Sequence, residues 1–216
     1  MNKQMIASQI ATILLQKSCL KVSPSSPFTY ASGLKGPMYC DNRKILAFVE
    51  ERALVIDAFV ELIEELNLEY DAICGLATAG IPHGALIAER LRKPFIYARS
   101  KPKGHGKRNQ IEGHFQSGDK VLIIEDLVNQ GKSLEEAVLG IKDAELNPIA
   151  CCSIVDYQMS MAIERAAKMQ IPLYALTNFD SIMTVAVELN IINETEKSDL
   201  MVWQNNPQKW SDDFTR

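Results

Sequence analysis

The stretch that decides the fold is Val121-Leu-Ile-Ile-Glu-Asp-Leu-Val-Asn-Gln-Gly-Lys-Ser133. Its first apolar residues, bounded by Asp119 and Glu125, are typical of a buried strand in a parallel sheet. A polar turn with one glycine follows, and Ser-Leu-Glu-Glu-Ala then begins a helical pattern. The sequence therefore predicts a strand–loop–helix unit within an α/β fold.

This unit carries a candidate binding site. Glu125 and Asp126 come at the carboxyl end of the strand, where ligands of open α/β sheets bind. The backbone N–H groups of the loop from Asn129 to Ser133 would meet the positive end of the helix dipole and could bind a phosphate monoester. The two carboxylates could accept hydrogen bonds from sugar hydroxyls or hold a hydrated divalent cation indirectly. These features suggest a sugar phosphate, while a polar loop with helix-capping acids is the alternative interpretation.

Composition excludes several classes of protein. The 216-residue chain is 47% hydrophobic and 23% charged, which is typical of a globular protein with one sizeable core. Its net charge of −4 gives no general attraction to nucleic acid. No window of about 18 apolar residues is present, so we expect no membrane span. The first ten residues lack the apolar segment of a signal peptide, and we expect a cytoplasmic protein.

The cysteines and histidines do not form a metal-ligand pattern. The five cysteines are odd in number and have no C-x-x-C spacing, so we expect reduced side chains that act as small core residues. The three histidines lack the clustering of a metal site.

A second strand–loop–helix unit spans residues 72–90. The segment from Gly75 to Gly80 consists almost entirely of small residues, which permit close approach of the backbone to a ligand. A tight packing turn would explain the same glycines without a ligand. Pro82 stands early in the predicted helix, where proline is tolerated, and we interpret His83 as structural.

A basic segment follows a short predicted strand at residues 94–98. Five of the chain's 23 Lys and Arg residues lie between Arg99 and Arg108, with His105 and with no acid. Its proline and glycines argue against a regular element, so we predict a mobile loop that could close over a polyanion. A solvated loop or a nucleic-acid contact is the alternative, although no aromatic residue interleaves the basic ones.

The remaining elements are predicted from hydrophobic periodicity. We expect two short strands, 28–30 and 38–40, as a hairpin around the turn at residues 33–37. We expect helices at 6–15, 45–66, 134–144, 163–169 and 178–189, strands at 148–155 and 173–176, and a tail with a short helix and a frayed end.

Three of these stretches together resemble the orotate phosphoribosyltransferases, which are type I phosphoribosyltransferases. Residues 121–133 resemble the family's PRPP-binding signature, in which an apolar strand and two acids precede a Thr/Ser-rich loop. The hood of the family is matched by Phe28-Thr29, Ser32-Gly33, Pro37, Tyr39, Asp41 and Arg43. The catalytic loop of the family is matched by Arg99, Lys103, His105-Gly106 and Glu112-Gly113.

The resemblance, which runs from about Ile6 to Asn190, implies a type I phosphoribosyltransferase fold. This is a central, mainly parallel sheet flanked by helices, in a single domain over 1–216. An N-terminal hood would take about residues 1–43, the core about 44–190 and a C-terminal tail 191–216. The implied reaction transfers the phosphoribosyl group from PRPP to orotate, with Mg²⁺, in pyrimidine biosynthesis.

The resemblance also implies the roles of individual residues. The implied catalytic residues are Arg99, Lys103, His105 and Asp126. Substrate binding is implied for Tyr39, Thr78, Ala79, Gly80, Glu125, Asp126, Leu127, Val128, Asn129, Gln130, Gly131, Lys132 and Ser133. Mg²⁺ would be bound mainly through PRPP, with no metal-ligating residue. The loop Arg99–Arg108 would reach the pyrophosphate of the other subunit in a homodimer.

Several positions depart from the family pattern. Asn129 stands at the usual Thr/Ser, and Lys132 replaces a loop glycine, which would cost of order 1 kcal/mol if that position needed a positive φ. Tyr157 stands where many members have an arginine for the orotate carboxylate, and Gly36 replaces a serine. Two alternatives therefore stay open: a regulator that senses PRPP without turnover, and a phosphoribosyltransferase for another base.

Overall fold

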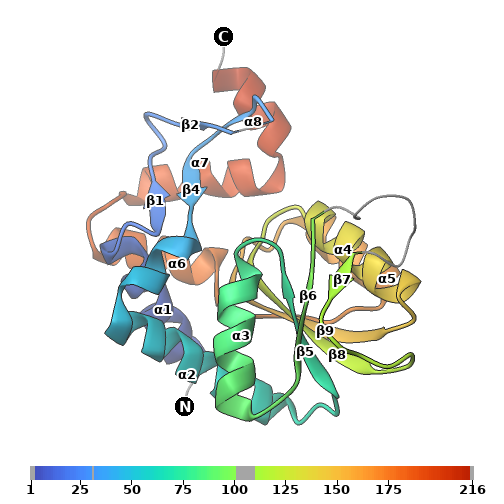
Figure 1. Cartoon of the computed structure of the whole chain (residues 1–216). Helices are drawn as coiled ribbons and strands as arrows, with labels where there is room; N and C mark the ends of the chain where they lie inside the picture. Colours follow the sequence, from blue (N-terminus) through green and yellow to red (C-terminus); the bar gives the residue numbers. More distant parts are fainter. Residues whose placement is uncertain (1–2, 31, 101–109, 215–216) are drawn as a thin grey trace.

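The computed structural model describes residues 3–30, 32–100 and 110–214, and it is built on one six-stranded sheet (Figure 1). The strand order is β10-β9-β8-β5-β6-β7, and every pairing is parallel except that of β6 with β7. The strands are β5 (Ala72–Leu76), β6 (Phe95–Ala98), β7 (Ile111–Glu112), β8 (Lys120–Val128), β9 (Asn147–Asp156) and β10 (Leu173–Asn178). The predicted α/β class and the mainly parallel sheet are confirmed.

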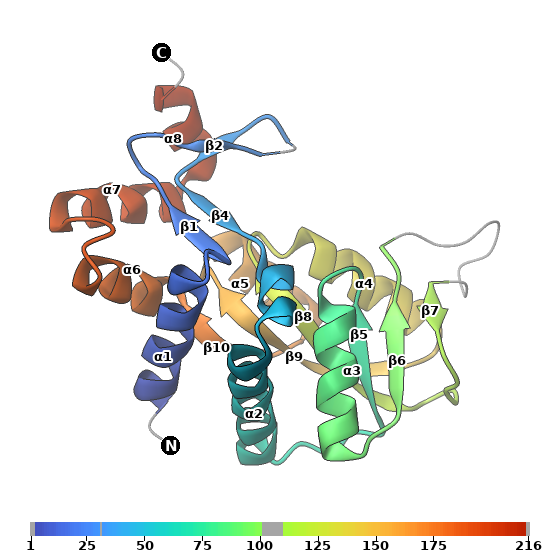
Figure 2. The same ribbon diagram turned by 60° about the vertical axis from the view of Figure 1, so that its left-hand side comes forward.

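Helices cover both faces of this sheet because its central strands are apolar on both sides (Figure 2). On β8, Leu122 and Ile124 pack in one core cluster, whereas Val121 and Ile123 pack in the other. The first cluster includes residues of α1 (Lys3–Gln16), α2 (Val49–Leu66), α3 (Gly80–Leu91) and α6 (Phe179–Glu188). The second includes residues of α4 (Lys132–Asp143) and α5 (Ser160–Met169). No described helix is long and apolar enough to cross a membrane.

The hood stands beyond the sheet and is built from both ends of the chain (Figures 1 and 2). Its elements are β1 (Leu20–Val22), β2 (Phe28–Thr29), β3 (Lys35–Gly36), β4 (Met38–Cys40), α7 (Glu194–Asn205) and α8 (Pro207–Phe214). The 3₁₀ helix η1 (Asn42–Ala47) then leads into the core. The predicted pairing of residues 28–30 with 38–40 is wrong. Instead β2 pairs with β3, and β4 pairs with β1, in two antiparallel ribbons.

The C-terminal tail differs from the predicted short helix and frayed end. It forms the two helices α7 and α8, and Trp203 of α7 is only 1% exposed. The Trp203 ring packs edge-on against Tyr157 and also contacts Phe179. The helix α8 packs on β3, where Ser211 Oγ accepts a hydrogen bond from the backbone N–H of Lys35. Burial of large aromatic surface therefore fixes the tail.

Among the other boundaries that differ from the predicted ones, three bear on the site. The predicted helix over 45–66 is divided at Phe48, whose extended backbone separates η1 from α2. The strand β8 continues through both acids to Val128, because it stays paired with β9 up to Asp156. The helix α4 begins at Lys132, which leaves the loop after β8 shorter than predicted.

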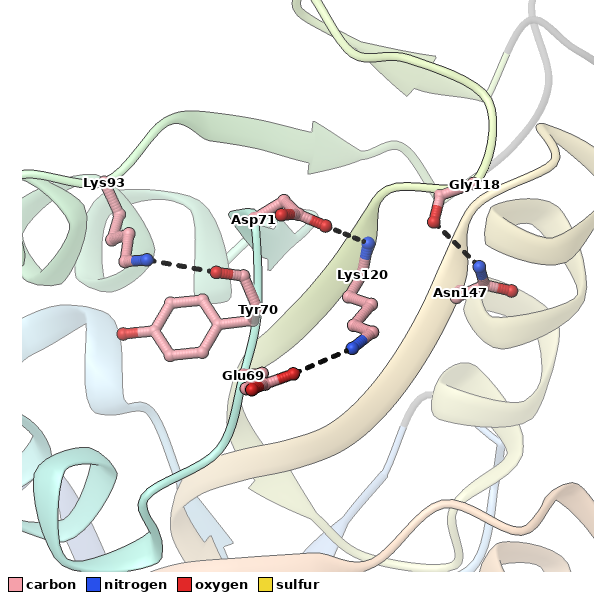
Figure 3. Close-up of polar contacts among 7 residues, drawn as sticks. All are labelled: Glu69, Tyr70, Asp71, Lys93, Gly118, Lys120 and Asn147. Carbon is pink, nitrogen blue, oxygen red and sulfur yellow. Dashed lines mark hydrogen bonds and ion pairs between the residues drawn. The ribbon is translucent and has the colours of Figure 1, made fainter.

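The amino ends of the central strands are closed by polar contacts (Figure 3). The backbone N–H of Lys120 donates to Asp71 Oδ2, and Lys120 Nζ lies 3.2 Å from Glu69 Oε2. Asn147 donates to the carbonyl of Gly118 at the start of the neighbouring strand. Main-chain polar groups at this edge are thus satisfied within the fold. At the opposite edge, where the strands have their carboxyl ends, β8 presents Glu125 and Asp126.

Candidate functional site

A cleft of about 620 Å³ lies between the hood and the carboxyl ends of the strands. From the core it is lined by Ala77, Thr78, Ala79, Glu125, Asp126, Leu127, Asn129, Gln130, Gly131, Lys132, Ser133 and Met159. From the hood and tail it is lined by Tyr30, Ser32, Leu34, Lys35, Cys40, Asp41, Arg43, Trp203 and Pro207. The fold therefore brings residues 77–79 of the predicted loop 75–80 and the predicted loop 129–133 into one cleft with the acid pair.

The two acids occupy different environments. Glu125 is 7% exposed, and its Oε1 accepts a hydrogen bond of 2.9 Å from the backbone N–H of Asp126. Burial raises the pKa of Glu125 well above its usual value, and the neighbouring Asp126 adds to this shift. Asp126 is less buried and lines the cleft. Both effects favour the uncharged form of Glu125, whereas Asp126 beside it is the more exposed of the two carboxyl groups.

Asn42 connects the hood to this acid pair. Its side chain is fully buried, and Nδ2 donates a 2.9 Å hydrogen bond to the backbone carbonyl of Asp126. The fully buried His83 of α3 lies close enough to Asp126 and Asn42 for both to influence its pKa, which burial lowers. His83 does not line the cleft, in keeping with a structural role.

The loop after β8 has the geometry of a helix N-terminus that faces the cleft. Gly131 is the N-cap of α4 and has a φ of 75°, in the left-handed region that favours glycine. Lys132 is the first helical residue and is not among the described residues with a positive φ, so the expected strain at Lys132 is absent. The buried Oδ1 of Asn129 has no hydrogen-bond partner among the described residues. The loop is therefore open to a ligand.

Arg165 of α5 supports this loop from behind. Its Nε donates to Glu135 Oε2 over 3.0 Å, and its guanidinium also donates to the backbone carbonyl of Gln130. The arginine therefore joins α5, α4 and the loop. Sequence reasoning missed it because the contact spans 35 residues.

The second loop lies where α3 meets the sheet. A Cβ at Gly80 would collide with the carbonyl oxygen of Ile124, and one at Gly75 would meet the backbone at Gly80. Both glycines are thus required for α3 to approach β5 and β8, which bears out the packing interpretation for them. Thr78 and Ala79 line the cleft in front of this contact, and the Ala77–Thr78 peptide is cis.

Several predicted site residues do not line the cleft. Tyr39 is 41% exposed and packs against Phe28, with the ring centroids 5.6 Å apart. Val128 is buried in the core, and Gly80 serves packing. Arg99 lies at the end of β6, where a guanidinium nitrogen is 3.6 Å from Glu112 Oε1. Lys103 and His105 lie outside the described residues.

The hood half of the cleft was the least predictable part. Tyr30, Met159 and Trp203 give it apolar walls, and they come from three distant segments. Tyr30 donates a hydrogen bond to the carbonyl of Met38, and a Cβ at Gly36 would collide with the Tyr30 hydroxyl. The Tyr30 side chain thus fills the space that Gly36 leaves. The sequence showed the glycine at position 36, but it did not show that the Tyr30 side chain would pack against it.

Comparisons with known proteins give one consistent family. The model of the phosphoribosyl transferase domain family matches residues 44–170. The orotate phosphoribosyltransferase of Coxiella burnetii is 41% identical over 204 residues, which cover 94% of this chain and 98% of that protein. The enzyme of the same name from Bacillus subtilis is 42% identical over 207 residues and covers 96% of each chain.

The fold comparison agrees with the sequence comparison. The crystal structure of the orotate phosphoribosyltransferase from Aeropyrum pernix superposes with a TM-score of 0.73 at 25% identity. The superposition covers 85% of this chain and 99% of that one. The similarity in fold therefore extends over most of the chain.

Proposed function

The chain belongs to the orotate phosphoribosyltransferase family, an enzyme family of pyrimidine biosynthesis, and we propose that the cleft under the hood is where the transfer takes place. In this reaction the bond from the anomeric carbon of PRPP to pyrophosphate breaks, a bond from that carbon to a ring nitrogen of orotate forms, and the proton of that nitrogen is released. The products are orotidine 5′-monophosphate and pyrophosphate. Nearly full-length relatives that act on orotate favour this base over others, and favour turnover over a purely sensing role.

The acid pair would bind the ribose. Glu125 and Asp126 stand side by side at the cleft, where they can accept hydrogen bonds from the two ring hydroxyls. The anomeric carbon gains positive charge as pyrophosphate leaves, and a nearby carboxylate of Asp126 would stabilise that charge. The hydrogen bond from Asn42 fixes the backbone that carries Asp126.

The loop 129–133 would bind the 5′-phosphate. Backbone N–H groups at the start of α4 and the positive charge of Lys132 both favour an anion there. The unpartnered oxygen of Asn129 is a hydrogen-bond acceptor for the same substrate or for the base. Leu127 would pack along the sugar from the end of β8.

The pyrophosphate would lie against Thr78 and Ala79 at the second loop. As pyrophosphate leaves, its growing negative charge needs nearby cations, for which the sequence predicts Arg99, Lys103 and His105. Arg99 begins the segment 99–108 and lines a small pocket with Ala77, Glu125 and Ser133, beside the cleft of its own chain. From the resemblance to the family we propose that the rest of the segment serves the other subunit of a homodimer, so that each cleft receives cations from its partner.

Mg²⁺ fits this site as an ion carried by PRPP. An octahedral Mg²⁺ needs about six oxygen ligands, more than the adjacent carboxyl groups of Glu125 and Asp126 supply. Oxygens of PRPP and water would therefore provide most of its coordination, with the acids in contact with the hydrated ion. When bound, the ion neutralises the charge of the pyrophosphate.

We place the enzyme in the cytoplasm, in keeping with five free cysteines. Of the predicted hood 1–43, α1 packs on α6 and β10 in the core, so residues 20–43 and the tail 191–216 would act together as the hood over the core 44–190.

One observation carries this proposal: the acid pair, the helix N-terminus at Gly131 and the hood share one cleft. The test is loss of orotate absorbance on incubation with PRPP and Mg²⁺. We expect consumption that requires both, a lower kcat in Lys103→Ala, and weaker binding together with slower turnover in Asp126→Asn. PRPP binding by calorimetry without orotate consumption would point to a sensor or another base. An absence of both would contradict the proposed site.

A further inference from the structure

We propose that Lys35 of the hood binds the carboxylate of the base substrate and thereby selects orotate. This inference rests on the proposed function, and it assigns a specificity residue in the half of the cleft that the sugar and phosphates do not use. It follows from the distribution of charge along the cleft, from the position of Tyr157 and from the way α8 fixes β3.

The first argument is the distribution of positive charge. The described cations that line the cleft are Lys35, Arg43 and Lys132. Lys132 begins α4 in the phosphate half, and Arg43 Nε is 2.6 Å from Asp41 Oδ1. Among the ion pairs between described residues, Lys35 takes part in none. Lys35 is therefore the cleft cation that remains available to an anionic base.

The second argument concerns the end of β9. The residue after Asp156 is Tyr157, which is 2% exposed and does not line the cleft. Its ring packs edge-on against Trp203 at 5.7 Å, and its backbone N–H donates to Val128. The position is thus part of the core and offers no cation. A carboxylate in the cleft must find its charge partner on another element.

The third argument is that the fold holds Lys35 in place. Lys35 pairs with Thr29 across the ribbon β2–β3, and its N–H donates to Ser211 Oγ over 2.9 Å. Its ammonium nitrogen lies 5.5 Å from the centre of the Phe214 ring. An aromatic face attracts a cation without neutralising it, so the charge stays available for a carboxylate. Phe214 does not line the cleft, so these contacts join Lys35, which does, to the C-terminal helix α8.

The fourth argument is the character of the walls beside Lys35. Tyr30, Leu34, Met159 and Trp203 line the same cleft as Lys35 and are apolar or aromatic. A flat pyrimidine ring fits such walls, and a few polar groups then fix its orientation. Ion pairing is also stronger where apolar side chains exclude water. Lys35 is therefore placed where a single charge can discriminate between bases.

The experiment compares two nucleotides that differ only in the carboxylate. Orotidine 5′-monophosphate carries it and uridine 5′-monophosphate does not. We would measure Kd for both, and for PRPP, by calorimetry with the full-length protein as wild type, Lys35→Gln and Lys35→Arg. Lys21→Gln is the matched control, because Lys21 is an exposed hood lysine that does not line the cleft.

We expect Lys35→Gln to raise the Kd for orotidine 5′-monophosphate by roughly 10- to 100-fold, which corresponds to the loss of a hydrogen bond between charged groups. Uridine 5′-monophosphate and PRPP should bind as in wild type, Lys35→Arg should recover most of the affinity, and Lys21→Gln should change nothing. Equal losses for both nucleotides, or no loss for either, would overturn the assignment. Failure of the wild-type protein to bind PRPP or consume orotate would instead refute the proposed function.

Discussion

Glu125 shows how a single buried residue can be costly for the fold and useful at the site. Its carboxyl group is almost fully buried beside Asp126, and in the described part of the chain it accepts a hydrogen bond from the backbone N–H of Asp126. Burial raises the pKa of Glu125 in the folded protein, so ionisation at this position is opposed by the fold. A hydroxyl of a bound sugar would give the group a second hydrogen-bond partner.

Glu125→Gln is expected to stabilise the protein at high pH while lowering activity. The folded pKa is raised above the usual value of 4.5, so wild type loses stability as pH rises from about 4.5 through the folded pKa. Glutamine keeps the oxygen that accepts from Asp126 and has no charge to bury. We expect a gain of about 1 kcal/mol in unfolding free energy at pH 8, measured by urea denaturation, and a smaller difference at pH 4.5.

The control for this prediction is Glu89→Gln on the exposed face of α3, which should change the unfolding free energy little at either pH. A Glu125→Gln protein that is less stable than wild type at pH 8 would show that the buried carboxylate is compensated. In that case the assigned protonation of the acid pair would be wrong.

Gly36→Ser is expected to disturb the hood because serine's Cβ would collide with the Tyr30 hydroxyl. Tyr30 donates to the Met38 carbonyl, and burial raises the pKa of its phenol to about 12, so the ring is an integral part of the hood. We expect a loss of about 1–3 kcal/mol in unfolding free energy, typical of overpacking. The double variant Gly36→Ser/Tyr30→Leu should recover part of this loss. Additive losses in thermal unfolding would mean that the two side chains do not compete for space.

At the scale of elements, the proposed phosphate loop 129–133 depends on two helices. The helix α4 supplies its N-terminus, and α5 supplies Arg165, which hydrogen-bonds to the carbonyl of Gln130 and to Glu135. The loop is therefore held in shape by a contact outside the cleft. A loop preformed for an anion loses less conformational entropy when the anion binds.

Arg165→Met is expected to raise KM for PRPP by about tenfold and to change kcat less, because it loosens the loop without removing a group that contacts the substrate. Steady-state kinetics with varied PRPP would measure this. Lys168→Met on the same helix is the control, since Lys168 is exposed and does not line the cleft. An unchanged KM for PRPP in Arg165→Met would contradict the proposed support.

The elements also show what sequence can and cannot predict. The unit β8–loop–α4 was predictable because its apolar run, acids and glycine are adjacent in the chain. Its strand nevertheless runs further than predicted, because Leu127 and Val128 keep pairing with β9 after the acids interrupt the apolar pattern. The hood strands have two or three residues each, too few for a periodicity, so their pairing was predicted wrongly.

The unpredicted side chains of the site have a common cause. Asn42 reaches Asp126 across 84 residues, and Lys35 meets Ser211 across 176. No local pattern encodes such contacts, which depend on how the hood packs on the core. The glycine at position 131 was visible in the sequence, but only the backbone showed that it, and not Lys132, has the positive φ.

At the scale of the whole molecule, the two edges of the sheet have different tasks. The amino edge is closed by contacts such as Lys120 with Asp71 and Glu69, so its polar groups are used for stability (Figure 3). The carboxyl edge leaves the acid pair and a helix N-terminus facing a cleft. The hood then closes this edge with segments from both ends of the chain, so the tail would take part in the proposed substrate binding.

The proposed homodimer makes a prediction that no single-chain mechanism shares. If the loop 99–108 acts in the partner's cleft, Lys103→Ala and Asp126→Asn impair different halves of each site. In a mixed dimer, one cleft combines an intact Asp126 with an intact Lys103, and the other cleft carries both changes. Random exchange makes half the dimers mixed, so an equal mixture should reach about a quarter of wild-type activity.

The measurement is orotate consumption after the two purified variants have been mixed and allowed to exchange subunits, with each variant alone as the baseline. Sedimentation would establish the dimer independently of activity. Recovery well above both baselines requires a loop that serves the other subunit, since a loop acting within its own chain leaves every cleft of a mixed dimer defective. If the protein is a dimer but activity does not recover, the homodimer stands and Lys103 acts in the cleft of its own chain. Arg99, which follows β6 and lies beside Glu112, would then begin a loop that acts within one chain.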